Sequence, residues 1–350
     1  MKNILLFIFF FVIFFMNNKV KGRIIEIPIN YTEFNHPIIN LCLGTPKQCL
    51  PFKLSLNTDI TYVIDYNIFG LGFEQEKSHT LSKIGSNVNF TDRNYNLQGF
   101  EVYDILQTEK NFLKKGFFKF YIVNKGFKYT NYCGVVGLKN SSFYSFINFI
   151  NLYGTGNKNN IIEIKTNNEG NKGSIIFGNN ISKDYNKINY VNETNPFEIF
   201  LNKVILFNDN YPKFTILNDL NESVLLSPEH NKIYCPEKFL NYLMDNLFNK
   251  FDKKETKSCL KKEEKGVYKY LLCNSFLLKE SIYIYFIFGK WNAKFLLNDL
   301  FTQVNDKLLI FNIMNLINED KWIFGNYFFK FYDFIYESKT PTLRLKKIKK

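Results

Sequence analysis

The side chains suited to acid–base chemistry gather in two short polar stretches, each of which follows a strand-like run. Residues 57–59 (Asn-Thr-Asp) come after Leu54–Leu56, and residues 218–222 (Asn-Asp-Leu-Asn-Glu) come after Phe214–Leu217. Two carboxyl groups held a few Å apart share one proton because both cannot ionise, and the ionised group can then activate a water molecule. The amide of Asn57 neither ionises near neutral pH nor accepts a proton from water. The two stretches therefore supply carboxylates for hydrolysis, together with an amide that cannot act in the same way.

The sequence gives no sign of other reaction centres. The three histidines, His36, His79 and His230, have no serine or cysteine elbow motif beside them. The six cysteines lack the spacing of a zinc site, so we expect neither a metal nor another cofactor.

Extended segments must position the polar stretches. Ile38–Cys42 and Leu50–Leu56 have the pattern of strands, and the turn around Gly44-Thr45-Pro46 predicts a hairpin between them. Val135-Val136-Gly137 and Ile323-Phe324-Gly325 each place two apolar residues before a glycine, a pattern that predicts a buried strand packed closely against a neighbouring backbone. Further strands are expected at Ile24–Pro28, Phe117–Val123, Ile161–Ile164, Gly173–Gly178 and Ser281–Gly289, and helices at Phe143–Leu152 and Pro236–Phe251.

Taken in chain order, these features resemble the pepsin-like aspartic proteases. That family has a Gly-Thr-Pro-x-Gln turn before its first catalytic loop, as in Gly44–Gln48, and a Gly-x-Leu-x-Phe-Gly strand that Gly173–Gly178 resembles. The resemblance implies a mainly β, bilobal pepsin-like acid protease fold, in which a cleft separates two pseudo-twofold-related β-barrel-like lobes. The N-terminal lobe would cover residues 23–188 and the C-terminal lobe residues 189–340.

The same resemblance places the catalytic dyad at Asn57 and Asp219. Asn57 stands where the family has its first aspartate, and Asp219 precedes Pro228 by nine residues, which is the family's spacing for the second. Loss of a general acid–base group costs ~10²–10⁴ in rate. We therefore expect a dyad that does not function.

The residues that would border the substrate also depart from the family pattern, which has a hydroxyl residue and then a glycine after each aspartate. The residues at and beside these positions are Thr58, Asp59, Leu220, Asn221 and Glu222. Thr58 keeps the family's hydroxyl, and the other four differ from the family pattern. The side chains at the two glycine positions would intrude on water and substrate.

A hairpin expected from Val88–Phe90 and Phe100–Leu106 occupies the place of the family's substrate-covering flap. The tyrosine of the family's flap aligns with Asp92 when no gap is introduced, and with Tyr95 only if residues are deleted.

Three functions follow as alternatives. The first is an inactive protease homologue that binds a peptide or protein ligand in the interlobe cleft by main-chain hydrogen bonds. The second is an active aspartic-type endopeptidase with an altered active site. The third is a surface interaction protein that does not use the cleft. We expect a monomer.

Composition agrees with a folded chain and narrows its partners. The 350 residues are 46% apolar, which is enough to bury the cores of two domains. The net charge of +13 comes from dispersed lysines without a nucleic-acid-binding motif, so we expect a solvated surface and no nucleic-acid partner. The densest basic cluster lies in residues 341–350, which we expect to form a solvated basic tail.

Residues 1–22 have the features of a secretory signal peptide. Lys2 precedes the apolar run Ile4–Met16, whose 13 residues are too few for a comfortable membrane span. The sequence allows two outcomes for this segment: cleavage after Gly22, or retention as an uncleaved anchor. After cleavage we expect no membrane span and a location outside the cell or in an endomembrane or vacuolar lumen.

A secretory route permits disulfides and glycosylation. Cys42 could pair with Cys49 across the predicted hairpin and Cys259 with Cys273, whereas Cys133 and Cys235 either pair or stay free. Glycosylation sequons occur at Asn30, Asn89, Asn140, Asn180, Asn192 and Asn221.

Overall fold

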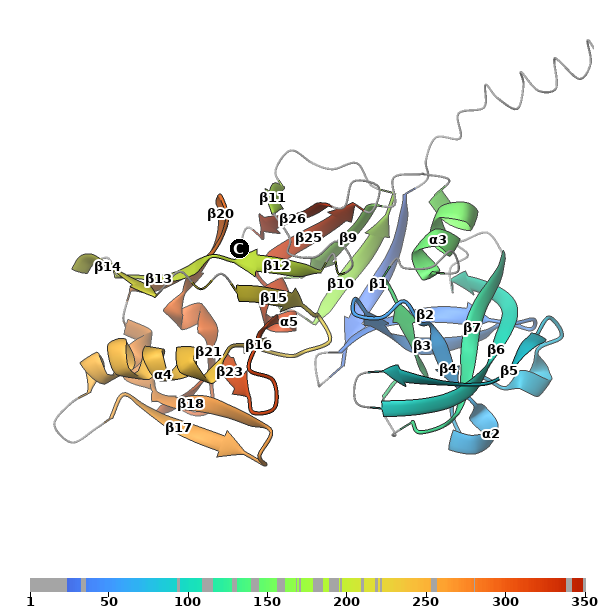
Figure 1. Ribbon diagram of the computed structural model, residues 1–350, viewed down its shortest axis with the longest axis horizontal. Coiled ribbons are helices and arrows are strands. Elements are labelled where there is room, and N and C mark those ends of the chain that lie inside the picture. Colours follow the sequence, from blue (N-terminus) through green and yellow to red (C-terminus); the bar gives the residue numbers. More distant parts are fainter. Residues whose placement is uncertain are drawn as a thin grey trace, which may run out of the picture.

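A computed structural model describes residues 24–32, 36–92, 95–108, 116–127, 131–139, 145–155, 161–167, 169, 171–178, 185–188, 195, 197–208, 211–217, 220, 222–252, 257–279, 281–337 and 342–348. The described chain is mainly β-structure in large sheets (Figure 1), which confirms the predicted structural class.

The largest sheet has 13 strands and contains both ends of the described chain. In spatial order they are β11 (Asn186–Ile188), β26 (Thr342–Lys347), β25 (Tyr332–Glu337), β9 (Ile161–Thr166), β10 (Lys172–Phe177), β1 (Ile25–Tyr31), β2 (Pro37–Leu43), β3 (Gln48–Ser55), β8 (Gly134–Gly137), β4 (Tyr62–Ile64), β7 (Gly116–Lys125), β6 (Tyr95–Thr108) and β5 (Ser82–Asp92). The first and last strands of the chain thus share a sheet that extends across the boundary expected between residues 188 and 189.

Two smaller sheets are built from the second half of the chain. The nine-stranded sheet contains β12 (Glu198–Leu201), β15 (Glu222–Leu226), β24 (Trp322–Phe324), β16 (Ile233–Tyr234), β23 (Ile313–Leu316), β18 (Tyr268–Asn274), β22 (Leu308–Phe311) and β21 (Phe301–Gln303), with β17 (Cys259–Glu264) paired to β18. The four-stranded sheet contains β14 (Tyr211–Leu217), β13 (Lys203–Asn208), β19 (Ile282–Phe288) and β20 (Trp291–Leu296).

The helical elements are short. They are α2 (Tyr66–Phe69), α3 (Phe146–Ile150), α4 (Glu237–Asn246) and α5 (Asn326–Phe329), with the single turns η1 (Gln75–Lys77), η2 (Asn151–Thr155), η3 (Phe248–Phe251), η4 (Ser275–Lys279) and η5 (Leu297–Leu300). The two helices predicted from the sequence correspond to α3 with η2 and to α4 with η3.

Period-two patterning explains why the strands form. In β1 the side chains of Ile25, Ile27 and Ile29 are buried while the intervening residues are exposed, so one face of the strand packs on the core. The strand β19 alternates in the same way along its whole length. Both strands contribute to one large core cluster that also includes the buried face of α4.

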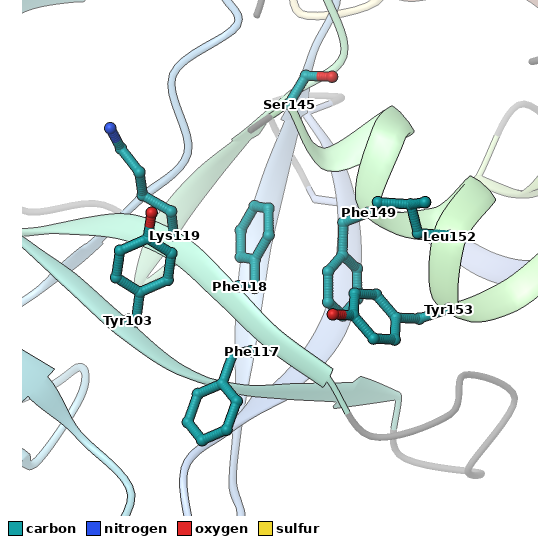
Figure 2. Close-up of a pocket in the computed structure, with 8 residues that line it drawn as sticks. All are labelled: Tyr103, Phe117, Phe118, Lys119, Ser145, Phe149, Leu152 and Tyr153. Atoms are coloured by element: carbon teal, nitrogen blue, oxygen red, sulfur yellow. The ribbon is translucent and has the colours of Figure 1, made fainter. Parts of the chain in front are cut away.

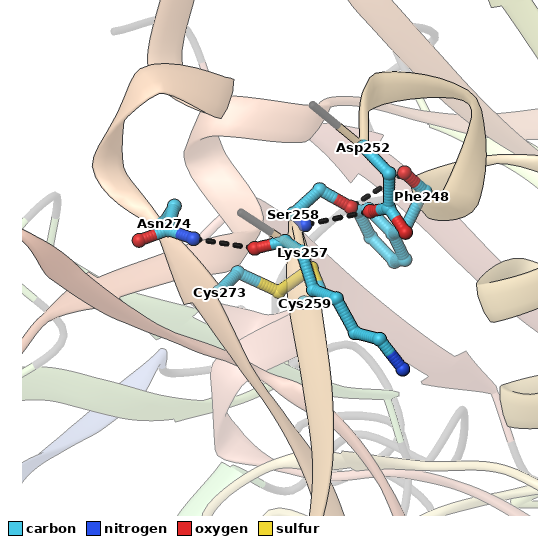
Figure 3. The surroundings of a disulfide bond; sticks show 7 residues. All are labelled: Phe248, Asp252, Lys257, Ser258, Cys259, Cys273 and Asn274. Carbon is cyan, nitrogen blue, oxygen red and sulfur yellow. Dashed lines mark hydrogen bonds between the residues drawn. A yellow bond between two sulfur atoms is a disulfide. The ribbon is translucent and has the colours of Figure 1, made fainter. Parts of the chain in front are cut away.

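The predicted disulfide pairs are confirmed. Cys42–Cys49 joins β2 to β3, and Cys259–Cys273 joins β17 to β18. Around the second bond, the Ser258 amide donates to Asp252 Oδ1 at 2.7 Å (Figure 3). The remaining cysteines, Cys133 and Cys235, are buried and free, and burial raises the pKa of both thiols.

The prediction of a solvated basic tail is wrong over Thr342–Lys347. This segment is β26, which pairs with both β25 and β11. Leu343 and Leu345 are fully buried, while Arg344 and Lys346 between and after them are partly accessible. The alternation of leucine with basic residues is a strand pattern with period two, and it outweighs the high local charge.

Candidate functional site

Two parallel strand pairs, one in each half of the chain, end in polar loops. In the first, β3 runs parallel to β8 with Leu54 opposite Val136 and Ser55 opposite Gly137. In the second, β15 runs parallel to β24 with Leu226 opposite Phe324. Each second strand contains one of the predicted pairs of apolar residues, and a glycine follows each pair.

The glycines after these segments let the backbones pack closely. A Cβ atom on Gly137 would lie 2.5 Å from the Thr58 carbonyl oxygen and 2.7 Å from that of Ile60. A Cβ atom on Gly325 would meet the carbonyl oxygens of His230 and Lys232 at 2.4 and 2.2 Å. Only glycine fits either place.

These contacts align the two loops residue by residue. Thr58 and Ile60 follow Ser55 by three and five residues, and His230 and Lys232 follow Ser227 by the same numbers. The residue two places after each serine therefore corresponds as well, so Asn57 in the first loop matches Glu229 in the second.

Reciprocal hydrogen bonds connect the matched positions. The Ser55 hydroxyl donates to Glu229 Oε1, and the Asn57 amide donates to Ser227 Oγ at 3.0 Å. The serine of each loop thus bonds the side chain two residues beyond the serine of the other loop. Asn57 Nδ2 also lies 3.3 Å from Glu229 Oε1, which brings an amide and a carboxylate together between the loops.

Glu229 is buried and is compensated by a cation. Its Oε2 atom lies 3.3 Å from the Lys53 ammonium group, and both side chains are almost inaccessible. The Lys53 ammonium group also lies over the ring of Tyr132, 5.3 Å from its centroid. Because an isolated buried charge is very unfavourable, this arrangement favours an ionised Glu229 held by Lys53.

Two histidines border the network. His36 Nδ1 lies 3.2 Å from the Glu229 carbonyl oxygen, and His230 Nδ1 lies 2.8 Å from Ser227 Oγ. The Ser227–His230 contact is not arranged for nucleophilic attack, because Ser227 is fully buried and its oxygen already accepts from Asn57. The histidines therefore support the loops.

The amide of Asn57 is only partly satisfied. Its nitrogen donates twice, whereas its Oδ1 atom is buried and has no hydrogen-bond partner among the described residues. The orientation of the amide follows from its neighbours, since the carboxylate of Glu229 requires a donor facing it.

The predicted site residues are only partly brought together. Thr58 and Asp59 share the loop of Asn57, but the Thr58 hydroxyl accepts from Ile60 N at 3.0 Å within that loop. The amide of Leu220 donates to the Asn202 carbonyl oxygen before β15 begins.

Glu222 lies at the opposite end of β15 from Ser227. Its carboxylate bonds Lys238 and accepts from Trp322 Nε1 at 2.7 Å. With ~3.3 Å per residue along a strand, it is about 16 Å from Ser227, the residue after β15 that bonds Asn57. Glu222 therefore supports α4 and β24, and Asp219 and Asn221 lie outside the described residues.

The hairpin expected from Val88–Phe90 and Phe100–Leu106 is present as β5 and β6. Tyr95 begins β6 opposite Asp92, where the two strands meet. Asp92 Oδ2 accepts a hydrogen bond of 2.8 Å from Tyr62 of β4, which ties the end of the hairpin to another strand of the same sheet.

Sequence reasoning did not single out Glu229 or Lys53. A signal for Glu229 was present, because Leu54-Ser55-Leu56-Asn57 and Leu226-Ser227-Pro228-Glu229 both begin with Leu-Ser after an apolar strand. Counting from Pro228 drew attention to Asp219 instead. Lys53 could not be found in this way, since nothing in the sequence marks it as a buried lysine.

No model of a known protein family matches this chain, and no curated protein is similar to it at a significant level. Within the described part of the chain, no three histidine, cysteine, aspartate or glutamate residues lie together as a metal site would require. Among the same residues, no helix is long and apolar enough to cross a membrane.

Proposed function

We propose that this protein is a pepsin-like protein of the secretory pathway that lacks proteolytic activity and binds an extended peptide or protein segment over the paired loops. Support comes from the order of the sequence motifs and from the repeated strand–loop units that meet at Asn57 and Glu229. The two disulfides are compatible with an oxidising compartment.

The observation that carries the proposal is the state of the carboxylate beside Asn57. Glu229 accepts from Ser55 and Asn57 through one oxygen and faces Lys53 through the other. Acid–base hydrolysis needs a carboxyl group that exchanges protons with a bound water and a second one that donates. The amide of Asn57 cannot donate the proton as the second carboxyl group would. The carboxylate of Glu229, which is buried and ion-paired, is poorly placed to exchange protons with a bound water.

An active peptidase is the second candidate. The contact of 3.3 Å between Asn57 Nδ2 and Glu229 Oε1 favours it, because an amide donor beside a carboxylate could orient a carbonyl oxygen while the carboxylate activates water. Burial of Glu229 to 2% exposure argues against this role, since a substrate would have to displace Asn57 to reach it.

Cleavage assays separate these candidates. The purified full chain is incubated with casein and with a fluorogenic peptide pool from pH 3 to pH 7, with and without pepstatin. We expect product formation no faster than in the blank. Pepstatin-sensitive cleavage that disappears in Glu229→Gln or in Asp219→Ala would overturn the proposal and identify the carboxylate responsible.

Peptide binding is tested separately on an array of extended octapeptides. We expect a subset to bind, and we expect Asp59→Lys to change that subset because Asp59 shares the loop of Asn57. The matched control is Asp245→Lys, an exposed position on α4. Absence of both cleavage and peptide binding would favour the third alternative, a surface interaction protein.

A further inference from the structure

An apolar cavity of about 260 Å³ lies between β7 and the α3–η2 segment, outside the paired loops. Phe118 and Phe149 form its floor and are nearly fully buried, with ring centroids 5.1 Å apart. Figure 2 shows the ring of Phe118 beside those of Phe149 and Tyr153, with Phe117, Ser145, Lys119 and Tyr103 around them at the edges.

The rim of this cavity is unusually apolar for an exposed surface. Phe117 is 57% exposed, Leu152 65% and Tyr153 37%, and all three line the same cavity. Other exposed large apolar residues lie elsewhere, such as Ile68 in α2 and Val304 in the turn between β21 and β22. Single exposed apolar side chains are ordinary, but a group around an open hydrophobic cavity marks a contact surface.

The entry of the chain into the fold points to the occupant. Ile25, the first residue of β1, pairs with Phe177, and the ring of Phe177 lies 6.1 Å from that of Phe146 in α3. The α3–η2 segment that begins there carries Leu152 and Tyr153. The sequence before β1 contains the apolar run Ile4–Met16 of the expected signal peptide, so this run enters the body on the α3 side for as long as it is retained.

We propose that Phe117, Leu152 and Tyr153, around this cavity, form a face that contacts an anionic phospholipid bilayer. Aromatic and aliphatic side chains with a tyrosine hydroxyl and a lysine at the edge suit the boundary between headgroups and acyl chains. The net charge of +13 adds attraction to an anionic leaflet. The cavity is smaller than most small-molecule sites, which favours a lipid surface over a soluble metabolite.

The face needs no retained anchor. If residues 1–22 remain, they hold the face close to the bilayer; if they are removed, the face itself supplies the affinity. The proposal is also independent of peptide binding, because β7 and α3 contribute none of the residues that connect the paired loops.

A tryptophan reporter tests the contact at the face itself. Leu152→Trp is prepared in the full chain and mixed with phosphatidylcholine–phosphatidylserine vesicles, with or without brominated acyl chains. We expect its emission to shift to the blue and to be quenched by the brominated lipid. The matched control is Val304→Trp, which replaces an apolar residue that is 52% exposed in the turn between β21 and β22. The emission added by this tryptophan should neither shift to the blue nor be quenched by the brominated lipid.

A second variant measures the affinity. Phe117→Ser with Tyr153→Ser should lower vesicle partitioning of the cleaved form by about tenfold or more, and added salt should weaken binding of the unmodified chain. Unshifted Leu152→Trp emission that remains quenched by aqueous iodide would overturn the proposal. A blue shift that appears without vesicles and grows with protein concentration would also overturn the proposal. It would show that the face contacts a second copy of the chain.

Discussion

Asn57 and Glu229 are best understood as one unit. A carboxylate as deeply buried as that of Glu229 needs donors on every side, and it finds them in Ser55, Asn57 and Lys53. An aspartate at position 57 would place a second negative charge beside Glu229, in a place where water cannot screen it. The amide that prevents acid–base chemistry is therefore also the side chain that suits this buried carboxylate.

The ion pair gives a stability prediction at this scale. Lys53→Met removes the cation and leaves Glu229 buried without its countercharge, so the free energy of unfolding at pH 7 should fall by about 3–5 kcal/mol. Urea unfolding followed by fluorescence measures the change. The control is Lys53→Met with Glu229→Gln, which should recover much of the loss because both charges are gone. Equal stability of Lys53→Met and the unmodified chain would show that the pair is unimportant.

Individual residues were the hardest feature to predict from the sequence. Asn57 was found because a hairpin motif precedes it, and the structure places it between the loops. Glu229 was missed because the second loop carries no comparable motif and Pro228 suggested another register. Which carboxylate meets Asn57 depends on how β15 pairs with β24, and strand register is a tertiary property.

At the scale of a single element, β25 contains a carboxyl group, that of Asp333, whose ionisation is made unfavourable by burial. Burial raises the pKa of Asp333 to about 6, with Glu163 adding to the increase and Thr166 N, Lys165 and Lys346 opposing it. Ionisation is therefore harder in the folded chain than in the unfolded chain. Stability present below about pH 4 should be lost as pH rises through about 6.

Asp333→Asn removes this pH dependence while keeping an acceptor for Thr166 N, which lies 3.4 Å from Asp333 Oδ1. We expect the free energy of unfolding to rise by about 1–2 kcal/mol at pH 7, and to change little at pH 4 where Asp333 is already neutral. Urea unfolding at the two pH values measures this, with the exposed Asp245→Asn of α4 as control. A gain of the same size at pH 4 would contradict the titration of Asp333.

Strands and hairpins were largely predictable because period-two patterning and turn residues are local signals. The β2–β3 hairpin and the disulfides at Cys42 and Cys259 follow from such patterns. Elements whose bounds depend on pairing with distant segments could not be predicted in this way. Strand β5 begins at Ser82, six residues before the predicted strand at Val88, because it pairs with β6, and the local sequence does not reveal this pairing.

The whole molecule is held together by strands from both ends of the sequence. β1 pairs with β10, β10 with β9, β9 with β25 and β25 with β26, so residues more than 300 positions apart belong to one continuous ladder. The two halves of the chain are therefore joined by this shared sheet as well as by the bonds between the paired loops. Completing the sheet requires the last strand of the chain.

Truncation tests that requirement. A chain ending at Glu337 lacks β26 and loses the buried side chains of Leu343 and Leu345, each of which stabilises the fold by about 1.5–3 kcal/mol. It also leaves the edges of β25 and β11 unpaired. Because total stabilities are about 5–15 kcal/mol, we expect a large fall in the urea midpoint or failure to accumulate as folded protein. A chain ending at Ile348 keeps β26 and should unfold like the full chain; equal midpoints for both truncations would mean that β26 contributes little.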